Sequence, residues 1–430
     1  MKVFLGIDLG STTSKAILVD AGGNIIGRGI TNTRSDYAVA TDIARMEAEF
    51  NSRFALLRRR LQEDTAGDSC WDQIIPRLED RFHWLQFQAR FDRLMDAMLQ
   101  GTALIEDAKL RLQMEQCLAE LSPRMRESSR RRFFNGEISA TSQFFRDLFS
   151  CAYVEEISAA PKDLYDALLA AYDRSINPAE NRRIDFDFGN LVRDALDLLP
   201  EEMAKQRGRV ERHLAAISNL PLQPADYIGT GYGRQLLPFE KQHIRSEILC
   251  HAFGAHACFP QTRTVLDIGG QDTKAIQVDP QGLVTSFQMN DRCAAGCGRY
   301  LGYIADEMNI SVGELGPLAL RADFETNICS TCTVFAGAEL REYLNLGEKK
   351  ENILAGLHKA IVQRAFALLA RSGGVRNEFT FTGGVARNPA VVKYVGQMVT
   401  QNYGNLTINN HPDSIFMGAL GAALFSVHRG

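Results

Sequence analysis

The chain has 430 residues, of which 45% are hydrophobic and 23% are charged, and these values are ordinary for a globular protein. This length predicts two or three domains, each large enough for its own core. The formal net charge of −4 argues against a nucleic-acid-binding or membrane-surface protein. The first ten residues lack the apolar run of a signal peptide and no stretch approaches the ~20 apolar residues of a membrane span, so a cytoplasmic protein is expected.

The chain opens with a predicted β-meander. Residues 2–9 predict a strand, which a Gly-Ser-Thr turn joins to a second strand at 14–20 and a hairpin turn joins to a third at 25–30. From about residue 40 to 218 the sequence becomes long, charge-rich and helical, with little glycine. A basic run within it, at 124–132, predicts a solvated helix face, and docking to an acidic partner is the alternative.

The opening pattern then returns at 262–288, as strand, Asp-x-Gly turn, strand, hairpin turn and strand. GIDLGSTTSKAILVDAGGNII and LDIGGQDTKAIQVDPQGLVTS share an Asp-x-Gly turn, a threonine and Lys-Ala-Ile. Such duplication predicts two similar halves that face each other across a cleft. We therefore expect a first lobe at 1–39 and 219–260, a helical insertion at 40–218 and a second lobe at 261–430.

Both Asp-x-Gly turns place a carboxylate at a strand end, beside backbone amides that the glycines leave accessible. Such amides and Ser/Thr hydroxyls can cradle phosphate, and the carboxylates can hold magnesium, usually through water. The first loop comprises Asp8, Gly10, Ser11, Thr12 and Thr13, followed by Lys15, and the second comprises Asp267, Gly269, Gly270, Gln271, Asp272 and Thr273. A third turn follows a predicted strand and precedes a predicted helix at Pro389, and it can accept an adenosine through Gly383 and Gly384.

These glycine turns allow other interpretations. Any one of them can be a tight hairpin with glycine at positive φ, but three in this order, with duplication, favour a nucleotide site. The sequence has no G-x-x-x-x-G-K-[ST], which excludes a P-loop enzyme. GTGYGR at 229–234 is too short for G-x-G-x-x-G and follows no clear predicted strand, so it is not interpreted as a Rossmann fingerprint.

With these motifs the chain resembles the actin, sugar-kinase and heat-shock-chaperone ATPase superfamily. GIDLGSTTSK and LDIGGQDTK are similar to its two phosphate motifs, and FTGGVARN is similar to its adenosine motif. The resemblance implies an α/β fold of two ribonuclease-H-like lobes that close on ATP, here with a large helical insertion. It also implies that Asp8 and Asp267 are catalytic and organise magnesium and the attacking water, with Gln271 as a further catalytic candidate in the second loop.

Nine cysteines in a reducing compartment are not expected to form a disulfide framework. Cys70, Cys117 and Cys151 lie in helical sequence and are expected to be small buried hydrophobes. The segment HIRSEILCHAFGAHACF at 243–259 contains histidines and cysteines that can bind metal, but its small residues favour a close-packed helix.

Four further cysteines lie in NDRCAAGCGRYL (290–301) and NICSTCTVFAGAEL (327–340). After Cys293, apolar residues recur on one helical face, which puts this thiol at or before a helix start, where the helix dipole favours a thiolate or an anionic cluster. Cys332 precedes a second predicted helix in the same way. Two thiolates cannot complete a four-cysteine iron–sulfur site, but two chains together can.

Three other interpretations of these cysteines stay open. Cys329 and Cys332 can form a redox dithiol. All four cysteines of the two segments can hold a structural zinc ion or a cluster within one chain. Cys297 and Cys329 can be simple buried residues, which is the interpretation favoured for those two.

NDRCAAGCGRYL, CSTCTVFAGAEL, TGYGR and TGGVARN resemble the signature of one family, over residues 1–35 and about 225–430. That family comprises ATP-dependent activators of 2-hydroxyacyl-CoA dehydratases and the nucleotide-binding subunits of benzoyl-CoA reductase. The resemblance implies a 4Fe–4S cluster shared between two subunits, with Cys293 and Cys332 as the ligands from each chain. Cys297 and Cys329 depart from the activator pattern, and so does the insertion at 40–218.

The insertion makes the larger ATP-binding subunit of benzoyl-CoA reductase the favoured identity. The implied function is ATP-driven, low-potential electron delivery for dearomatisation of an aromatic acyl-CoA. The implied partners are a smaller paralogous ATPase subunit in a heterodimer, acyl-CoA-binding reductase subunits and a ferredoxin-type electron donor. The alternatives are a 2-hydroxyacyl-CoA dehydratase activator, an iron-free sugar kinase of the same superfamily, and a zinc protein that senses nucleotide.

Overall fold

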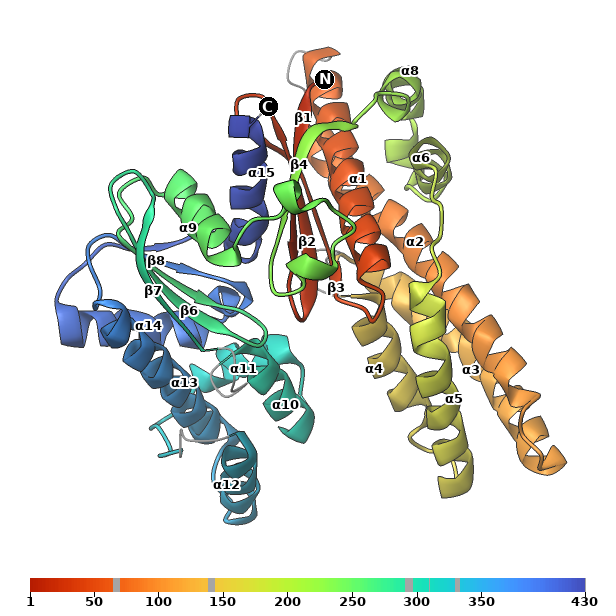
Figure 1. Ribbon diagram of the computed structural model, residues 1–430. Coiled ribbons are helices and arrows are strands. Elements are labelled where there is room, and N and C mark those ends of the chain that lie inside the picture. The colour runs from red at the N-terminus through yellow and green to blue at the C-terminus, as the bar shows by residue number, and fades with distance from the viewer. Residues whose placement is uncertain (65–69, 138–143, 291–296, 309, 329–332, 430) are drawn as a thin grey trace. The chain divides into compact units, whose positions relative to one another are not determined.

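The computed structural model describes residues 1–64, 70–137, 144–290, 297–308, 310–328 and 333–429, without the side chains of 333–336. The chain divides into two compact units (Figure 1). The helical unit is Ile26–Leu222 with Met1, and the two-sheet unit is Lys2–Ile25 with Gln223–Gly430. Both Asp-x-Gly turns and the strands on either side of each turn therefore lie in the two-sheet unit, whereas the strand predicted at 25–30 falls almost wholly in the helical unit.

The helical unit follows the long helical stretch that the sequence predicts. Its elements are β3 (Ile25–Asn32), α1 (Tyr37–Asp64), α2 (Trp71–Thr102), α3 (Ala108–Phe134), α4 (Phe145–Ile157), α5 (Lys162–Asn181), α6 (Phe188–Asp197), α7 (Glu201–Ala204) and α8 (Arg207–Ser218). Helix α2 contacts both α3 and α5, and its residues from Trp84 to Met98 share a core with them (Figure 1). Gly29 lets α1 approach β3 closely, because a Cβ there would lie 1.9 Å from the Ala44 carbonyl oxygen.

Two aromatic-rich cores stabilise this unit. In the first, Phe54 and Phe82 pack edge to face with ring centroids 5.1 Å apart. In the second, Phe149 stacks on Tyr172 with centroids 5.8 Å apart. Buried aromatic side chains contribute about 0.5–1.5 kcal/mol per such pair beyond the area that they bury. The helical unit therefore has apolar cores of its own.

The two-sheet unit contains two similar sheets. In the first, β1 (Val3–Leu9) pairs antiparallel with β2 (Thr13–Asp20) and parallel with β4 (Pro224–Thr230). The second has the order β7-β6-β5-β8-β9, and its strands are β5 (Thr264–Ile268), β6 (Thr273–Val278), β7 (Val284–Asn290), β8 (Phe379–Thr382) and β9 (Ile408–Asn410). Strand β5 pairs antiparallel with β6 and parallel with β8, so the sequence repeat is also a repeat of structure.

Helices complete the two-sheet unit. They are η1 (Arg234–Leu236), η2 (Lys241–His243), α9 (Glu247–Cys258), α10 (Gly298–Met308), α11 (Val312–Ala319), α12 (Thr333–Asn345), α13 (Lys350–Ser372), η3 (Gly384–Arg387), α14 (Pro389–Tyr403), η4 (Ser414–Phe416) and α15 (Met417–Arg429). Among the described helices, α13 has the length and apolar composition of a membrane-crossing helix, but most of it is buried inside the protein, as core helices are.

The predicted close packing of the 243–259 segment is confirmed for α9. A Cβ at Gly254 would lie 2.1 Å from the Met417 carbonyl oxygen, and a Cβ at Gly421 would lie 1.9 Å from the Cys250 carbonyl oxygen. Small residues on both helices therefore let the α9 and α15 backbones touch (Figure 1).

Two other sequence expectations have different outcomes. The basic run in α3 forms ion pairs at the surface, including Arg124 with Glu156 at 2.8 Å, which agrees with a solvated helix face. The expectation that Cys151 is buried is wrong, because this residue is exposed on α4. The buried face of that helix is formed by Phe149 and Tyr153.

Candidate nucleotide site

Asp8 and Lys15 form the first half of the site. They lie opposite each other in the β1–β2 ladder, and Lys15 Nζ is 3.2 Å from Asp8 Oδ2. Their side chains are only 4% and 11% exposed, so this ion pair is shielded from solvent. The turn between the strands holds the predicted phosphate-loop residues Gly10, Ser11 and Thr12.

Asp267 and Lys274 repeat this arrangement in the second sheet. They lie opposite each other in the β5–β6 ladder, with Lys274 Nζ 3.3 Å from Asp267 Oδ2 and 2.8 Å from Asp272 Oδ1. Thr382 on the neighbouring strand donates a hydrogen bond to Asp267 Oδ1 at 2.9 Å. The carboxylate at the end of each central strand is therefore held by a buried lysine.

His251 on α9 is a further member of the site. Its Nδ1 lies 3.1 Å from Asp267 Oδ1. A Cβ on Gly418 would lie 2.8 Å from His251 Nε2 and 3.0 Å from Asp8 Oδ2, so the imidazole extends from one aspartate toward the other. The sequence favoured packing for this helix, with metal binding as the alternative, and did not connect His251 with the nucleotide site. The one available signal was Glu247, which is buried one helical turn earlier on the same helix.

Charge balance keeps Asp267 ionised. Burial would raise the pKa of this carboxyl, but His251 and Lys274 outweigh that effect and hold its pKa well below the ordinary range. In the same way burial would lower the pKa of His251, and the Asp267 charge raises it. Burial raises the pKa of Glu247 beside them. The site thus contains a fixed negative charge enclosed by cations.

The two predicted phosphate loops meet. A Cβ on Gly270 of the second loop would lie 2.1 Å from Thr12 Oγ1 of the first. Gly269 N donates to the Asp272 carbonyl oxygen at 2.9 Å and closes the second loop. The structure therefore brings together the two loops that the sequence predicted separately. Gln271 lies in the second loop and is partly exposed.

The TGYGR segment also reaches this site, which corrects the interpretation that it follows no strand. Strand β4 ends at Thr230 and is parallel to β1. Gly231 has φ +97°, and a Cβ there would lie 2.5 Å from Asp8 Oδ1. Gly233 N donates to the Leu9 carbonyl oxygen at 2.9 Å. The short strand has mixed polar and apolar residues, and this composition concealed it in the sequence.

The third glycine turn packs against the end of β5. Gly383 has φ +89°, and a Cβ there would lie 2.3 Å from the Ile268 carbonyl oxygen, so only glycine fits without strain. The next helix starts at Pro389 as predicted, because Asn388 accepts hydrogen bonds from Ala390 N and Val391 N. Thr382 lies opposite Asp267 in the β5–β8 ladder. The turn starts at the next residue, Gly383, and is therefore adjacent to the end of β5 that carries Asp267.

Helix α10 is bonded directly to the second phosphate loop. Gly298 N donates to the Gly269 carbonyl oxygen at 2.8 Å, and Arg299 N donates to the Gly270 carbonyl oxygen at 2.7 Å. The apolar face predicted for this helix is confirmed, since Tyr300, Leu301, Ile304 and Met308 are all buried. The start of the helix is therefore fixed to the loop by main-chain atoms.

The proposed cluster ligands Cys293 and Cys332, and also Cys329, lie outside the described residues. Cys297 is described and is buried in the core of the second sheet, as the packing interpretation requires. Within the described part of the chain, no three His, Cys, Asp or Glu side chains converge on one metal position. The donor set still fits magnesium nucleotide, because magnesium is usually held by one or two carboxylates together with waters and substrate phosphates.

The chain is similar to proteins of one family along most of its length. Residues 5–426 match the BadF/BadG/BcrA/BcrD ATPase family. The chain is 40% identical to the 2-hydroxyisocaproyl-CoA dehydratase activator of Clostridioides difficile over 197 residues, which are 46% of this chain and 71% of the relative. It is 32% identical to one of the benzoyl-CoA reductase subunits of Thauera aromatica over 212 residues, 49% of this chain and 75% of the relative.

A solved structure supports the same fold. The activator of the 2-hydroxyisocaproyl-CoA dehydratase from Clostridium difficile with bound ADPNP aligns with a TM-score of 0.52 and 22% identity, covering 99% of this chain and 95% of that chain. At this identity the likeness establishes the fold alone, which is the α/β fold of the actin and sugar-kinase-like ATPases. The chain belongs to the BadF/BadG/BcrA/BcrD ATPase family.

Proposed function

We propose that this chain is an ATP-hydrolysing electron-transfer protein that acts as an activator of a 2-hydroxyacyl-CoA dehydratase. The sequence alone favoured a benzoyl-CoA reductase subunit. The relatives favour the activator, since identity reaches 40% with an activator and 32% with the reductase subunit. The observation that carries the proposal is the pair of main-chain hydrogen bonds between the second phosphate loop and α10, the helix directly after the Cys293 motif.

The proposed nucleotide chemistry uses the two repeated turns. Asp8 and Asp267 would hold magnesium through water, and Gln271 would orient the attacking water. Phosphate would be bound by the loop residues Gly10, Ser11, Thr12, Thr13, Lys15, Gly269, Gly270, Asp272 and Thr273, and the adenosine by Gly383 and Gly384. His251 would position Asp267, because its ring lies 3.1 Å from that carboxylate. The two sheets would form the lobes proposed at 1–39 with 219–260 and at 261–430.

Coupling to electron transfer follows from the connection to α10. Cys293 and Cys332 of each of two subunits would hold a 4Fe–4S cluster, which supplies a low-potential one-electron carrier when bound. Any movement of Gly269 and Gly270 on ATP binding or hydrolysis would be passed to α10 through the two hydrogen bonds. Ligand orientation and solvent exposure set the potential of such a cluster, so a movement of this helix would change the driving force.

The test is anaerobic purification followed by iron analysis and an ATPase assay. We expect about four irons per dimer, ATP hydrolysis, and electron transfer from reduced ferredoxin to a dehydratase. Cys293→Ala and Cys332→Ala should each lose the iron and keep the fold. Cys151→Ala is the matched control, because that thiol is exposed on α4 in the other unit, and it should keep the iron. Iron retained in either of the first two variants would overturn the assignment.

A second candidate is the ATP-binding subunit of a benzoyl-CoA reductase-type complex. Each of the two relatives compared above matches less than half of this chain, and the large helical unit favours a component of a bigger assembly. Co-purification separates the two candidates: a reductase subunit stays with a smaller paralogue and acyl-CoA-binding subunits, whereas an activator dissociates. An iron-free sugar kinase would show no brown colour and would phosphorylate a sugar.

A further inference from the structure

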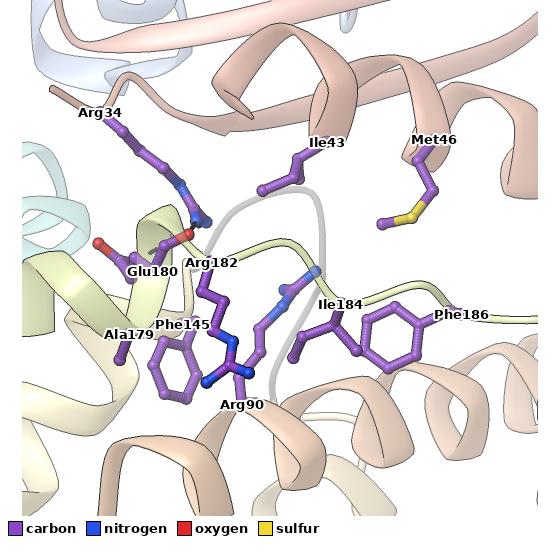
Figure 2. Close-up of a pocket in the computed structure, with 10 residues that line it drawn as sticks. All are labelled: Arg34, Ile43, Met46, Arg90, Phe145, Ala179, Glu180, Arg182, Ile184 and Phe186. Carbon is purple, nitrogen blue, oxygen red and sulfur yellow. Dashed lines mark hydrogen bonds and ion pairs between the residues drawn. The ribbon is translucent and has the colours of Figure 1, made fainter. Parts of the chain in front are cut away.

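The helical unit contains a small hollow whose lining is rich in arginine (Figure 2). Arg34, Arg90 and Arg182 line it together with one carboxylate, that of Glu180. The rest of the lining is apolar and comprises Ile43, Met46, Phe145, Ala179, Ile184 and Phe186. None of these residues belongs to the candidate nucleotide site, which lies in the other unit.

Arg34 is buried with one donor unused. Its side chain is 6% exposed and extends toward Glu180 in Figure 2. Nη1 donates to the Glu180 carbonyl oxygen, and Nη2 lies 4.0 Å from the Glu180 carboxylate. Nε is buried and has no hydrogen-bond partner among the described residues. Buried polar groups in proteins are nearly always bonded, and a bound ion is one ordinary explanation for an exception.

The charges around the hollow are unbalanced toward positive. The Glu180 carboxylate also accepts from Arg146 Nε at 2.9 Å, so two guanidinium groups share it. Arg90 pairs with Glu47 at 3.3 Å. Arg182 is exposed, and among the described residues the carboxylates of Asp42 and Asp185 pair with the neighbouring Arg183 instead.

The pKa of Arg34 is lowered chiefly by burial and to a smaller extent by the neighbouring arginines. Burial is the main cause that lowers this pKa, to about 10, and the charges of Arg90 and Arg146 act in the same direction, against the opposing effect of Glu180. An anion in the hollow would offset both effects. A guanidinium presents a planar fork of donors that matches carboxylate and phosphate oxygens, which makes arginine the usual residue for such anions.

We propose that this hollow binds a small oxyanion, a carboxylate or phosphate group, through Arg34, Arg90 and Arg182. The Arg34 Nε–H would donate to the anion, and the small size of the hollow would restrict the ligand to a small oxyanion. This anion site is separate from the proposed nucleotide site. It would give the helical unit a ligand-binding role of its own.

Calorimetric titration of the full chain tests the proposal, with ADP and Mg²⁺ present in excess so that the proposed phosphate loops are occupied. The probes are inorganic phosphate and acetate, each compared with chloride at equal ionic strength. We expect one of them to bind, and the probe that does so identifies the anion class. Arg182→Gln should weaken binding about tenfold to hundredfold, as loss of one charged hydrogen-bonding group does.

Arg81→Lys is the matched control. Arg81 is also buried and its Nη1 also has no hydrogen-bond partner in the described structure, but its guanidinium lies 3.6 Å from the Phe134 ring and does not line the hollow. This variant should bind the probe as the wild type does. Arg34→Lys should weaken binding, and Arg182→Gln keeps the test valid if Arg34→Lys fails to fold, because Arg182 is exposed. Absence of binding above the chloride baseline, or equal binding by Arg182→Gln and wild type, would overturn the proposal.

Discussion

Acid should destabilise this protein through His358, a histidine buried in α13. His358 Nδ1 donates to the Leu354 carbonyl oxygen at 2.6 Å, and Asn388 Nδ2 donates to Nε2 at 2.9 Å. The Asn388 amide cannot turn round to accept a proton from Nε2, because its oxygen caps α14 at Ala390 N and Val391 N. The site therefore holds a neutral imidazole, and burial lowers the pKa of His358 from 6.5 to about 4.

The direction and size of the change in unfolding free energy with pH follow from the proton binding of His358 in the folded and unfolded chain. Below about pH 6.5 the unfolded chain binds a proton that the folded chain does not bind, so stability is complete above that pH and falls as the pH drops toward 4. A fall of the pKa from 6.5 to about 4 corresponds to about 3 kcal/mol in total. Most of this, about 2–3 kcal/mol, should be lost between about pH 7.5 and about pH 4.5.

Urea unfolding of wild type and His358→Gln across this pH range measures the effect. The variant starts less stable, because it loses the bond to Leu354, but it should lose about 2–3 kcal/mol less on acidification than wild type. His428→Gln is the control, since His428 is exposed at the end of α15, and it should follow the wild-type curve. Parallel curves for wild type and His358→Gln would refute the reasoning.

Two further predictions concern the core and the site. Gly356→Ala should destabilise the fold by about 1–3 kcal/mol or more, because its Cβ would lie 1.7 Å from the Thr326 carbonyl oxygen. Gly396→Ala is the control: no described atom lies within 4 Å of the added Cβ, so this variant should be neutral or more stable by up to about 1 kcal/mol. Thermal unfolding compares the two variants. Asp267→Asn should reduce the rate of ATP hydrolysis about a hundredfold or more. It should also lower the free energy of unfolding by about 3 kcal/mol, because the buried Lys274 loses one of its two carboxylate partners and keeps only Asp272. Phosphate release and urea unfolding measure these effects. Hydrolysis by the variant at the wild-type rate would show that Asp267 is not catalytic.

Local patterns predicted much of the two-sheet unit. The strands around the first Asp-x-Gly turn lie within about two residues of their predicted positions, and those around the second follow the predicted order and end within about two residues of the predicted span 262–288, because alternation and turn residues are local signals. The helix start at Pro389 and the buried face of α10 were predicted from equally local sequence signals. The pairing of Asp8 with Lys15 and of Asp267 with Lys274 was implicit in the duplicated sequence, since each lysine stands seven residues after its aspartate.

Contacts between distant segments could not be predicted in this way. His251 faces Asp267 across 16 positions of sequence and from a different element, and its helix carried only a packing signal. The hollow in the helical unit joins Arg34, after β3, to Arg182, after α5, and no periodicity connects them. The exposure of Cys151 depended on which face of α4 its neighbours bury.

The connection between Gly269–Gly270 and α10 is made by carbonyl oxygens and amide hydrogens alone. Alanine substitutions in α10 from Arg299 onward would leave it intact, because every residue except proline offers the same amide. A family could therefore vary these side chains freely without losing the connection, and sequence comparison would not reveal it. Replacing the Arg299 amide by an ester, or Arg299→Pro, removes one of the two donors, and such backbone changes can separate the nucleotide loop from the helix that follows the cysteine motif.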